Sequence, residues 1–197
     1  MNLLFRIKTD ELVCPPIEVN AHTTETLSNG MIKEVYLRDF EPNLYVTMEA
    51  LKDPAYAVTK YTAILHNGLD RPVRLYQLDA GVAIPADDVS VRYFSSDWGT
   101  EFIPHSKKLE GEFSFASVAG RSSKGFEPWC GLETPNGCYS AAMAWSGCWN
   151  CRITPAEGHT QFSMGLTTEE FFTDVQPGER FVSPSFYLAQ GNTLVEA

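Results

Sequence analysis

The stretch "NLYVTMEAL" at residues 43–51 alternates apolar and polar side chains with a period of two. The stretch "KYTAILHN" at residues 60–67 repeats this pattern. The apolar positions are Leu44, Val46 and Met48 in the first stretch and Tyr61, Ala63 and Leu65 in the second. Because successive side chains of a strand point to opposite faces of a sheet, both stretches predict half-buried β-strands.

The rest of the chain continues in strands and turns. Residues 31–40, 112–115 and 161–166 show the same alternation. Turn sequences separate the apolar runs: "SNG" at 28–30, "HNGLDRP" at 66–72, "PNG" at 135–137, "PAEG" at 155–158 and "QPGE" at 176–179. One helix-like signal, "TTEEFF" at 167–172, has the spacing of a capping box but is only about one turn long. The sequence therefore predicts an all-β antiparallel sandwich with little helix, in a single domain over residues 1–197.

Composition narrows the possible functions and location. The chain has 197 residues, of which 44% are hydrophobic, and a formal net charge of −10. This charge disfavours binding to nucleic acid or to an anionic membrane surface. No run approaches the roughly 20 apolar residues of a membrane span. The N-terminal "MNLLFRIKTDELVC" is interrupted by charged residues and does not resemble a secretion signal, so we expect a cytoplasmic protein.

Cysteines and histidines give no strong signal for metal or redox chemistry. The cysteines are Cys14, Cys130, Cys138, Cys148 and Cys151, and the histidines are His22, His66, His105 and His159. The "CWNC" motif has no second pair at zinc-site spacing, and on a strand its two cysteines would face opposite sides. The histidines have no ligand spacing and favour surface or turn positions. We therefore expect free thiols, no metal and no cofactor.

The stretch "YFSSDWGTEF" at residues 93–102 holds the strongest acidic candidates, Asp97 and Glu101. Two carboxyl groups flanking one glycosidic bond would suit the acid and the nucleophile of a glycoside hydrolase. However, Gly99 between them indicates a turn, where acidic side chains commonly accept hydrogen bonds from backbone amides. The residues alone leave both interpretations open.

The segment "GRSSKGFEPWCGLETPNG" at residues 120–137 is rich in turn-forming residues and interrupts the strand pattern. It nevertheless contains the large apolar side chains of Phe126 and Trp129. Aromatic side chains in a long loop usually pack on something, so this segment indicates a contact with another part of the protein or with another domain.

Several segments then follow one another in the order found in one enzyme family. They are "RYFSSDWGTEF", "LEGEFSFASVAGRSSKGFEPW", "GCYSAAMAWSGCW", "GHTQFSMGL" and "PGERFVSPSFYLAQG", which lie within residues 90–191. This series resembles the N-terminal domain of α-galactosidases of glycoside hydrolase family 36. The typical run there is S-x-D-W-G-x-E-F, then G-R-S-S with P-W a few residues on, then A-W-S-G-N-W and P-G-E-x-F-x-x-P. Cys148 departs from this pattern, because the family usually has asparagine there.

The resemblance implies a fold and a division of labour. It implies an antiparallel β-supersandwich of the galactose-mutarotase-like kind, with catalysis by two aspartates in a following (β/α)₈ barrel. A barrel needs about 250 residues, so we expect the barrel and its catalytic residues to be absent from this chain. The implied partner is that barrel, in the same protein or in a neighbouring subunit, with a galactoside and a homo-oligomer as further expectations.

The resemblance also suggests which residues contact the barrel or the sugar. These candidates are Asp97, Trp98, Arg121, Ser122, Ser123, Trp129, Trp145 and Trp149. We expect Asp97 and a partly buried Arg121 to lie close together and to tie the strand end to the "GRSS" loop. Two alternatives to a supporting domain remain: a stand-alone carbohydrate-binding sandwich and an oligomerisation module.

Overall fold

The computed structural model describes residues 2–19 and 21–197, without the side chains of residues 14, 15, 18, 21 and 22. The expectations for Cys14 and His22 fall on side chains outside the described part. Within it, the chain forms strands and no helix. The strands are β1 (Asn2–Thr9), β2 (Val13–Val19), β3 (Ala21–Thr26), β4 (Ile32–Glu41), β5 (Leu44–Asp53), β6 (Val58–Asn67), β7 (Val73–Ile84), β8 (Ser90–Asp97), β9 (Thr100–Lys108), β10 (Phe113–Ser117), β11 (Gly125–Thr134), β12 (Gly137–Ala144), β13 (Trp149–Ala156), β14 (His159–Leu166), β15 (Thr173–Val175), β16 (Arg180–Val182) and β17 (Ser185–Gly191).

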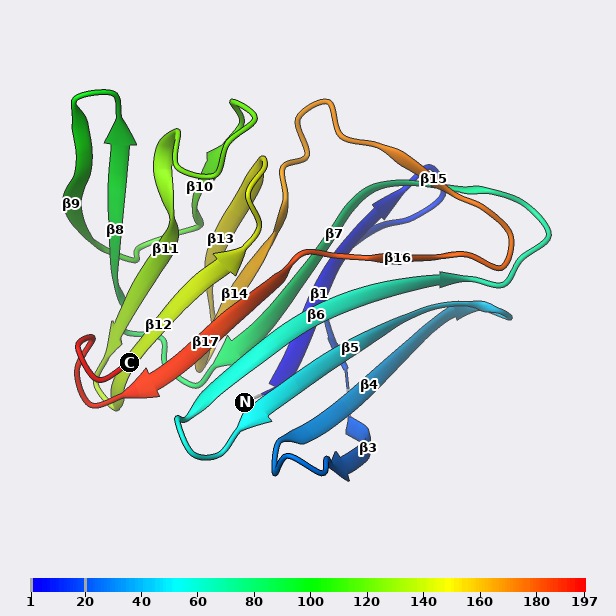
Figure 1. Cartoon of the computed structure of the whole chain (residues 1–197), viewed down its shortest axis with the longest axis horizontal. Coiled ribbons are helices and arrows are strands. Elements are labelled where there is room, and N and C mark those ends of the chain that lie inside the picture. Colours follow the sequence, from blue (N-terminus) through cyan, green and yellow to red (C-terminus); the bar gives the residue numbers. More distant parts are fainter. Residues whose placement is uncertain (1, 20) are drawn as a thin grey trace.

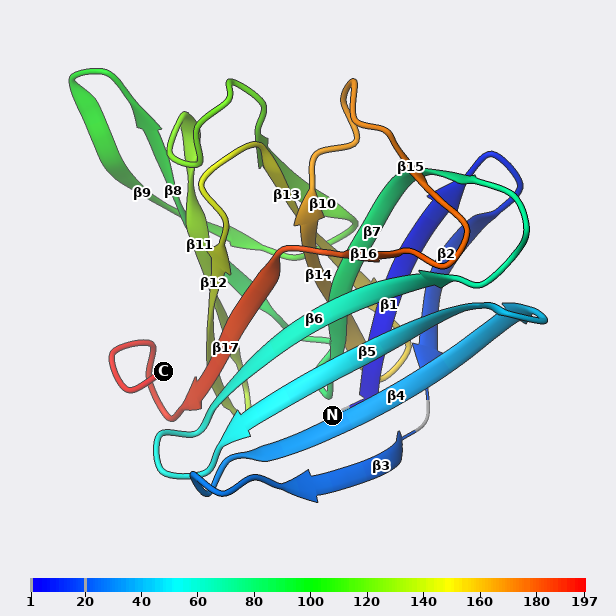
Figure 2. The ribbon, with the colours of Figure 1, turned by 45° about the vertical axis from the view of Figure 1, so that its right-hand side comes forward.

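Two sheets form the architecture, and the described strand pairs are antiparallel. Sheet A has seven described strands in the order β10-β13-β14-β7-β1-β2, with β15 also paired to β7. Sheet B has ten in the order β3-β4-β5-β6-β17-β12-β11-β8-β9, with β16 also paired to β6. Figure 1 shows sheet B in front of sheet A, and the turned view in Figure 2 shows β1, β2 and β7 behind β4, β5 and β6. The predicted antiparallel sandwich is therefore confirmed.

The hydrophobic core lies between the two sheets. Phe162 of β14 and Phe186 of β17 meet across it in an edge-to-face contact, with 5.4 Å between their ring centroids. Phe5 of β1 and Phe40 of β4 make a similar contact at 6.0 Å. Each fully buried side chain of this size stabilises the fold by about 1.5–3 kcal/mol, so such aromatic pairs join the sheets.

The predicted inward-facing positions of two stretches are confirmed. Val46 and Met48 of β5 are 0% exposed, as are Ala63 and Leu65 of β6. β5 and β6 pair directly with each other, so their buried faces form one continuous surface. The period-two pattern therefore identified both the strands and the face that each strand buries.

The helix-like segment at 167–172 forms no helix. The Thr167 hydroxyl accepts a hydrogen bond from the Glu169 amide, as in a tight turn. Glu170 has a backbone φ of +56°, in the left-handed region that a right-handed helix excludes. The described residues contain no helix that is long and apolar enough to cross a membrane.

The segment expected as a long loop is shorter than predicted. β11 covers Gly125–Thr134, so only residues 118–124 form a connection between β10 and β11. Phe126 packs inside this domain, with 5.5 Å between its ring centroid and that of Phe115. Trp129 lies on β11, and its indole N–H donates to the Ser140 hydroxyl at 2.8 Å. The expectation of a long loop was wrong, because strand pairing with β8 and β12 orders these residues.

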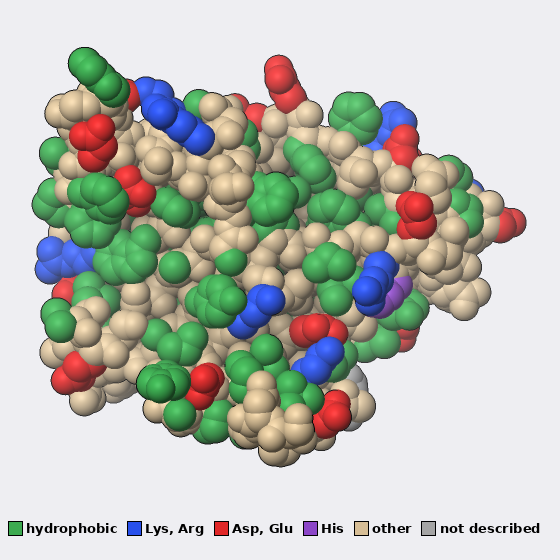
Figure 3. Space-filling view, viewed as in Figure 1, with side chains coloured by type: hydrophobic (Ala, Val, Ile, Leu, Met, Phe, Trp, Pro, Cys, Tyr) green, Lys and Arg blue, Asp and Glu red, His purple; other side chains and the backbone are tan. Residues whose placement is uncertain are grey.

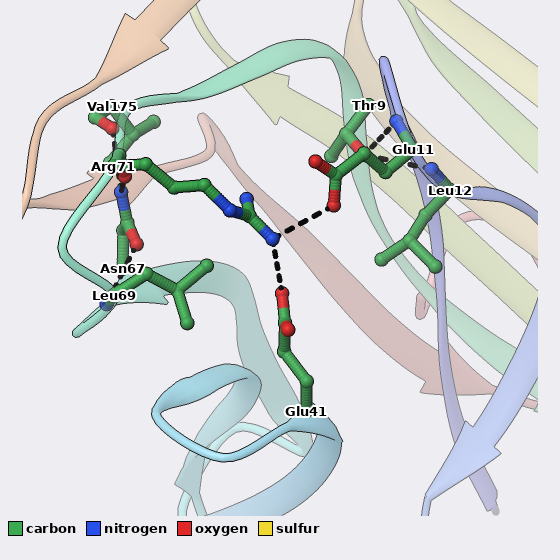
Figure 4. A network of polar contacts seen from close by, with 8 residues as sticks. All are labelled: Thr9, Glu11, Leu12, Glu41, Asn67, Leu69, Arg71 and Val175. Carbon is green, nitrogen blue, oxygen red and sulfur yellow. Dashed lines mark hydrogen bonds and ion pairs between the residues drawn. The ribbon is translucent and has the colours of Figure 1, made fainter.

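A network of polar contacts joins the connections at the right-hand end of the molecule in Figure 1. The Asn67 amide donates to the carbonyl oxygens of Arg71 and Val175, at 2.9 Å and 2.8 Å. Arg71 in turn forms ion pairs with Glu11 and Glu41, both at 3.0 Å (Figure 4). Since Asn67 is 1% exposed, it is the buried centre of this network.

A second polar cluster lies on sheet A, away from the central core. Asp79 of β7 is 0% exposed and accepts a hydrogen bond from the Gln77 amide at 2.6 Å. Gly165 of β14 leaves room for it, because a Cβ atom there would collide with the Asp79 carboxylate. The guanidinium groups of Arg6 and Arg152 favour the charged carboxylate, but burial has the larger effect and raises the pKa of Asp79 to about 6.

Candidate functional site

Four connections between strands meet at one end of the sandwich, at the upper side of Figure 1. We call this region the loop end. It comprises residues 98–99 between β8 and β9, 118–124 between β10 and β11, 145–148 between β12 and β13, and 167–172 between β14 and β15. Seven of the eight candidate residues from the sequence lie in or beside these connections, and Trp129 lies further along β11.

The β8–β9 turn holds the two acidic candidates. The Asp97 carboxylate accepts a hydrogen bond from the Trp98 amide at 2.7 Å, and the Glu101 carboxylate accepts one from the Gly99 amide at 3.2 Å. Gly99 has a φ of +76°, which glycine adopts without the strain that other residues would incur. Both carboxylates therefore cap the backbone of a tight turn, which is the second of the two interpretations open from the sequence.

The tie between β8 and the "GRSS" loop is made by Lys124. Its ammonium group forms an ion pair with the Asp97 carboxylate. The hydrogen bond from the Lys124 ammonium group holds the pKa of Asp97 below its usual value. The hydrogen bond from the Trp98 amide has the next largest effect in the same direction. Arg121 is exposed and adds only its positive charge to this effect. The expectation of a partly buried Arg121 that ties the strand end to the loop was therefore wrong: Arg121 is exposed, and Lys124 forms the ion pair with Asp97.

Asp97 and Arg121 nevertheless line the same hollow, which has a volume of about 220 Å³. Its wall also includes Trp98, Glu101, Phe102 and Ser123. Pockets that enclose a drug-sized ligand usually measure roughly 300–1,000 Å³, so this hollow is small for one. With Glu127, which also lines it, the hollow combines three carboxylates, a guanidinium group and two aromatic rings, which suits the side chain of a docked protein.

Trp149 lies beneath the loops and is hydrogen-bonded to Ser122 of the 118–124 connection. Trp149 is 0% exposed, and its indole N–H donates to the Ser122 carbonyl at 2.7 Å. The Ser122 amide donates to the Ser146 carbonyl at 3.1 Å and so joins two of the connections. The expected surface contact is not available at Trp149, because its ring packs edge-to-face on Phe115 inside the core.

The remaining two tryptophans lie in different places. Trp145 is 45% exposed in the connection between β12 and β13. Its indole covers Gly147, where a Cβ atom would come within 2.8 Å of the ring nitrogen. Trp129 instead lines a separate hollow with Phe94, their ring centroids 5.2 Å apart. The structure therefore brings Trp98 and Trp145 to the loop end but not Trp129.

Large apolar side chains are exposed around the loop end. They are Trp98, Phe102, Ile103, Val118, Trp145 and Phe172, each with at least 44% of its surface exposed. Figure 3 shows further hydrophobic side chains at its left, over β8, β9 and β11 below the loop end. Phe102 and Lys124 were not among the candidates predicted from the sequence. Both occur in the quoted motifs, but only the fold shows that one is exposed and that the other pairs with Asp97.

The described cysteines are free, whereas the described histidines depart from the surface or turn positions expected of them: His66, His105 and His159 are half-buried on strands β6, β9 and β14. Cys130, Cys138, Cys148 and Cys151 are free thiols. Cys148 accepts a hydrogen bond from the Gly120 amide at 3.1 Å, whereas Cys151 is fully buried, so the two face different surroundings. Burial raises the pKa of the Cys151 thiol. Among the described residues, no group of three His, Cys, Asp or Glu is placed to hold a metal ion.

The two sheets form an antiparallel β-sandwich. Residues 21–175 match the glycosyl hydrolase family 36 N-terminal domain, and the chain belongs to this family. No curated protein sequence matches the chain.

Solved structures with this fold include several α-galactosidases. The α-galactosidase from Lactobacillus brevis superposes with a TM-score of 0.77 at 17% identity, over 98% of this chain and 27% of that one. The family 36 α-galactosidase AgaA from Geobacillus stearothermophilus gives 0.77 at 19% identity, over 96% and 30%. The galactosidase domain of an α-galactosidase–sucrose kinase gives 0.77 at 17%, over 96% and 30%. The chain thus spans less than a third of the length of these proteins.

Proposed function

We propose that this domain is the non-catalytic N-terminal part of an α-galactosidase and that its loop end docks against the catalytic (β/α)₈ barrel. The family membership supports the first statement, and the α-galactosidases of the same fold support the activity. The observation that carries the second is the set of six exposed apolar side chains around four adjoining connections. Exposed apolar patches that are rimmed by charged groups commonly mark protein contacts.

The acidic residues of the loop end support a positioning role rather than catalysis. A retaining glycosidase needs two carboxyl groups about 5 Å apart and directed at one glycosidic bond. Here Asp97 and Glu101 accept hydrogen bonds from backbone amides of their own turn, and Asp97 also pairs with Lys124. A carboxylate with these partners is held as a fixed charge, so hydrolysis belongs to the barrel.

The proposal also includes the location of the enzyme and the origin of the barrel. We propose a cytoplasmic enzyme, because Cys130, Cys138, Cys148 and Cys151 are free thiols, which suits a reducing compartment. The barrel that the loop end contacts belongs to the same protein or to a neighbouring subunit. Raffinose is the natural first substrate to test, since a variant of the Geobacillus enzyme is described in complex with it.

The test compares this chain alone, the barrel-containing segment encoded with it, and the two mixed. Hydrolysis of an aryl α-galactoside and of raffinose is measured, together with association of the two segments. We expect no turnover by the chain alone and association through the loop end. Trp98→Ala and Trp145→Ala should each weaken association by about tenfold or more, because buried tryptophans often dominate interfaces.

The control is Tyr45→Ala, which removes an aromatic ring from the other end of sheet B and should leave association unchanged. Turnover by the isolated chain that disappears in Asp97→Asn would show that the β8–β9 turn is an active site and would overturn the proposal. A stable homo-oligomer that forms through the loop end and excludes the barrel would favour an oligomerisation module instead.

A further inference from the structure

A second hollow lies on the outer face of sheet B, away from the loop end. Its volume is about 390 Å³, within the usual range of small-ligand sites. The side chains that matter for its chemistry are Leu51, Asp53, Tyr56, Val58, Lys60 and Tyr187. They come from β5, β6, the turn between these strands and β17.

Strand register explains why these side chains share one face. Lys60 of β6 pairs with Leu51 of β5 on one side and with Tyr187 of β17 on the other. Paired residues in an antiparallel sheet project to the same face. Two residues along, Asp53 pairs with Val58 and continues the same face. The apolar Leu51 and Val58 therefore form a floor between the two charged side chains.

The β5–β6 turn holds Tyr56 at the rim of the hollow. The Asp53 carboxylate accepts a hydrogen bond from the Ala55 amide at 2.9 Å, and the Ala57 carbonyl accepts one from the Gln190 amide. Ala57 has a φ of +52°, a conformation that costs a residue other than glycine about 1 kcal/mol. The turn is therefore fixed in an unfavourable backbone conformation that leaves Tyr56 77% exposed.

The hollow combines two tyrosine rings with one charge of each sign. Tyr187 is 42% exposed, and neither Asp53 nor Lys60 forms an ion pair with a described residue. An apolar peptide covering the hollow would bury the Asp53 carboxylate and the Lys60 ammonium group without an opposite charge beside either, which is unfavourable. A phosphate group would meet the Asp53 carboxylate and the net charge of −10.

A neutral sugar satisfies all of these groups. The C–H groups of a pyranose ring pack on aromatic faces, while its hydroxyl groups donate to a carboxylate and accept from an ammonium group. In a galactosyl ring the axial 4-hydroxyl leaves one face rich in C–H groups, which suits contact with a tyrosine ring. The ring would lie over Leu51 and Val58, between Tyr56 and Tyr187.

We propose that this hollow is a non-catalytic binding site for the pyranose ring of an oligosaccharide. The choice of a galactosyl ring rests on the proposed function, whereas the site itself rests on its side chains. Such a site would hold an oligosaccharide on the domain while the barrel acts on chain ends. It lies on a sheet face separate from the loop end, so docking and sugar binding are independent properties.

The test is a titration of the ¹⁵N-labelled 197-residue chain with raffinose, followed by amide chemical shifts. Sucrose, which is raffinose without its galactosyl group, serves as the ligand control. We expect raffinose to shift the amides of residues 51–60 and of Tyr187, and sucrose to shift them less. Tyr56→Ala and Tyr187→Ala should each weaken binding about tenfold, the effect of losing one aromatic contact. Tyr56→Phe should retain binding.

Two variants complete the design. Asp53→Asn should weaken binding, and Tyr45→Ala, which removes a ring from the same face of β5 outside the hollow, should not change it. Absence of shifts at the hollow with millimolar raffinose would overturn the proposal, as would shifts confined to the loop end. Equal shifts with sucrose would overturn the galactosyl assignment. Shifts that grow with protein concentration alone would show that a second copy covers the hollow.

Discussion

The buried carboxyl group of Asp79 should make the stability of this domain depend on pH. The side chain is 0% exposed, and burial raises its pKa from 3.8 to about 6 despite the amides and arginines around it. Asp79→Asn replaces the carboxylate by a neutral amide of the same shape. The comparison of the two proteins therefore isolates the cost of a buried negative charge.

The sign follows from the two pKa values. Below pH 3.8 the carboxyl group is protonated in both the folded and the unfolded chain, so it costs nothing. As pH rises towards 6 the unfolded chain releases its proton first, and folding is progressively disfavoured. A pKa difference of about two corresponds to about 3 kcal/mol, of which about 2 kcal/mol develops between pH 4 and pH 7.

The assay is urea unfolding of wild type and Asp79→Asn at pH 4, 5, 6 and 7. The free energy of unfolding of the variant, relative to wild type, should rise by about 2 kcal/mol across this range. Asp87→Asn, which removes an exposed carboxylate, reports the effect of charge alone. A difference between wild type and Asp79→Asn that stays constant with pH would refute the reasoning. A difference that falls with pH would show that Arg6 and Arg152 outweigh burial.

Three further predictions concern single contacts. Asn67→Ala should lower the free energy of unfolding by about 2–4 kcal/mol, since it leaves the carbonyl oxygens of Arg71 and Val175 buried without donors. Chemical denaturation measures this free energy, and a loss below about 1 kcal/mol would contradict the network. Native Cys148 should react with a thiol reagent faster than Cys151, whose burial raises its pKa, and peptide mapping that finds the reverse order would contradict the burial. Lys124→Met should raise the pKa of Asp97 towards its ordinary value, which NMR titration of the carboxyl carbon measures. In the wild type, the ion pair is lost as pH falls through the pKa of Asp97. An unchanged pKa in the variant would show that the hydrogen bond from the Trp98 amide suffices to lower it.

Local patterns in the sequence were enough for the fold class. The alternation at 43–51 and 60–67 identified β5 and β6 and the faces that they bury, because the period of a strand is a property of consecutive residues. The ordered motifs between residues 90 and 191 indicated the family that the match over residues 21–175 shows. The predicted loop at 120–137 was too long, because its glycines and prolines are typical of turns. Pairing with β8 and β12 nevertheless stabilises a strand within it.

The partners within the candidate site depended on the tertiary structure. Arg121 and Lys124 lie three residues apart in one loop, and the charge pattern does not say which of them reaches Asp97. In the folded chain Lys124, the residue directly before β11, forms the ion pair with Asp97. Trp149 and Trp145 are equally apolar in sequence, yet one is buried and the other is 45% exposed, because β13 begins at Trp149.

The hollow on sheet B depends most strongly on long-range structure. Its floor and rim come from residues 51–60 and from Tyr187, which pair only because β17 returns to lie beside β6. The alternation of apolar and polar side chains depends only on residues that are neighbours in the chain, so it predicts the strands and the faces that they bury. Which strands become neighbours, and which side chains then share a surface, follows from burial of the whole core and is encoded by no single segment.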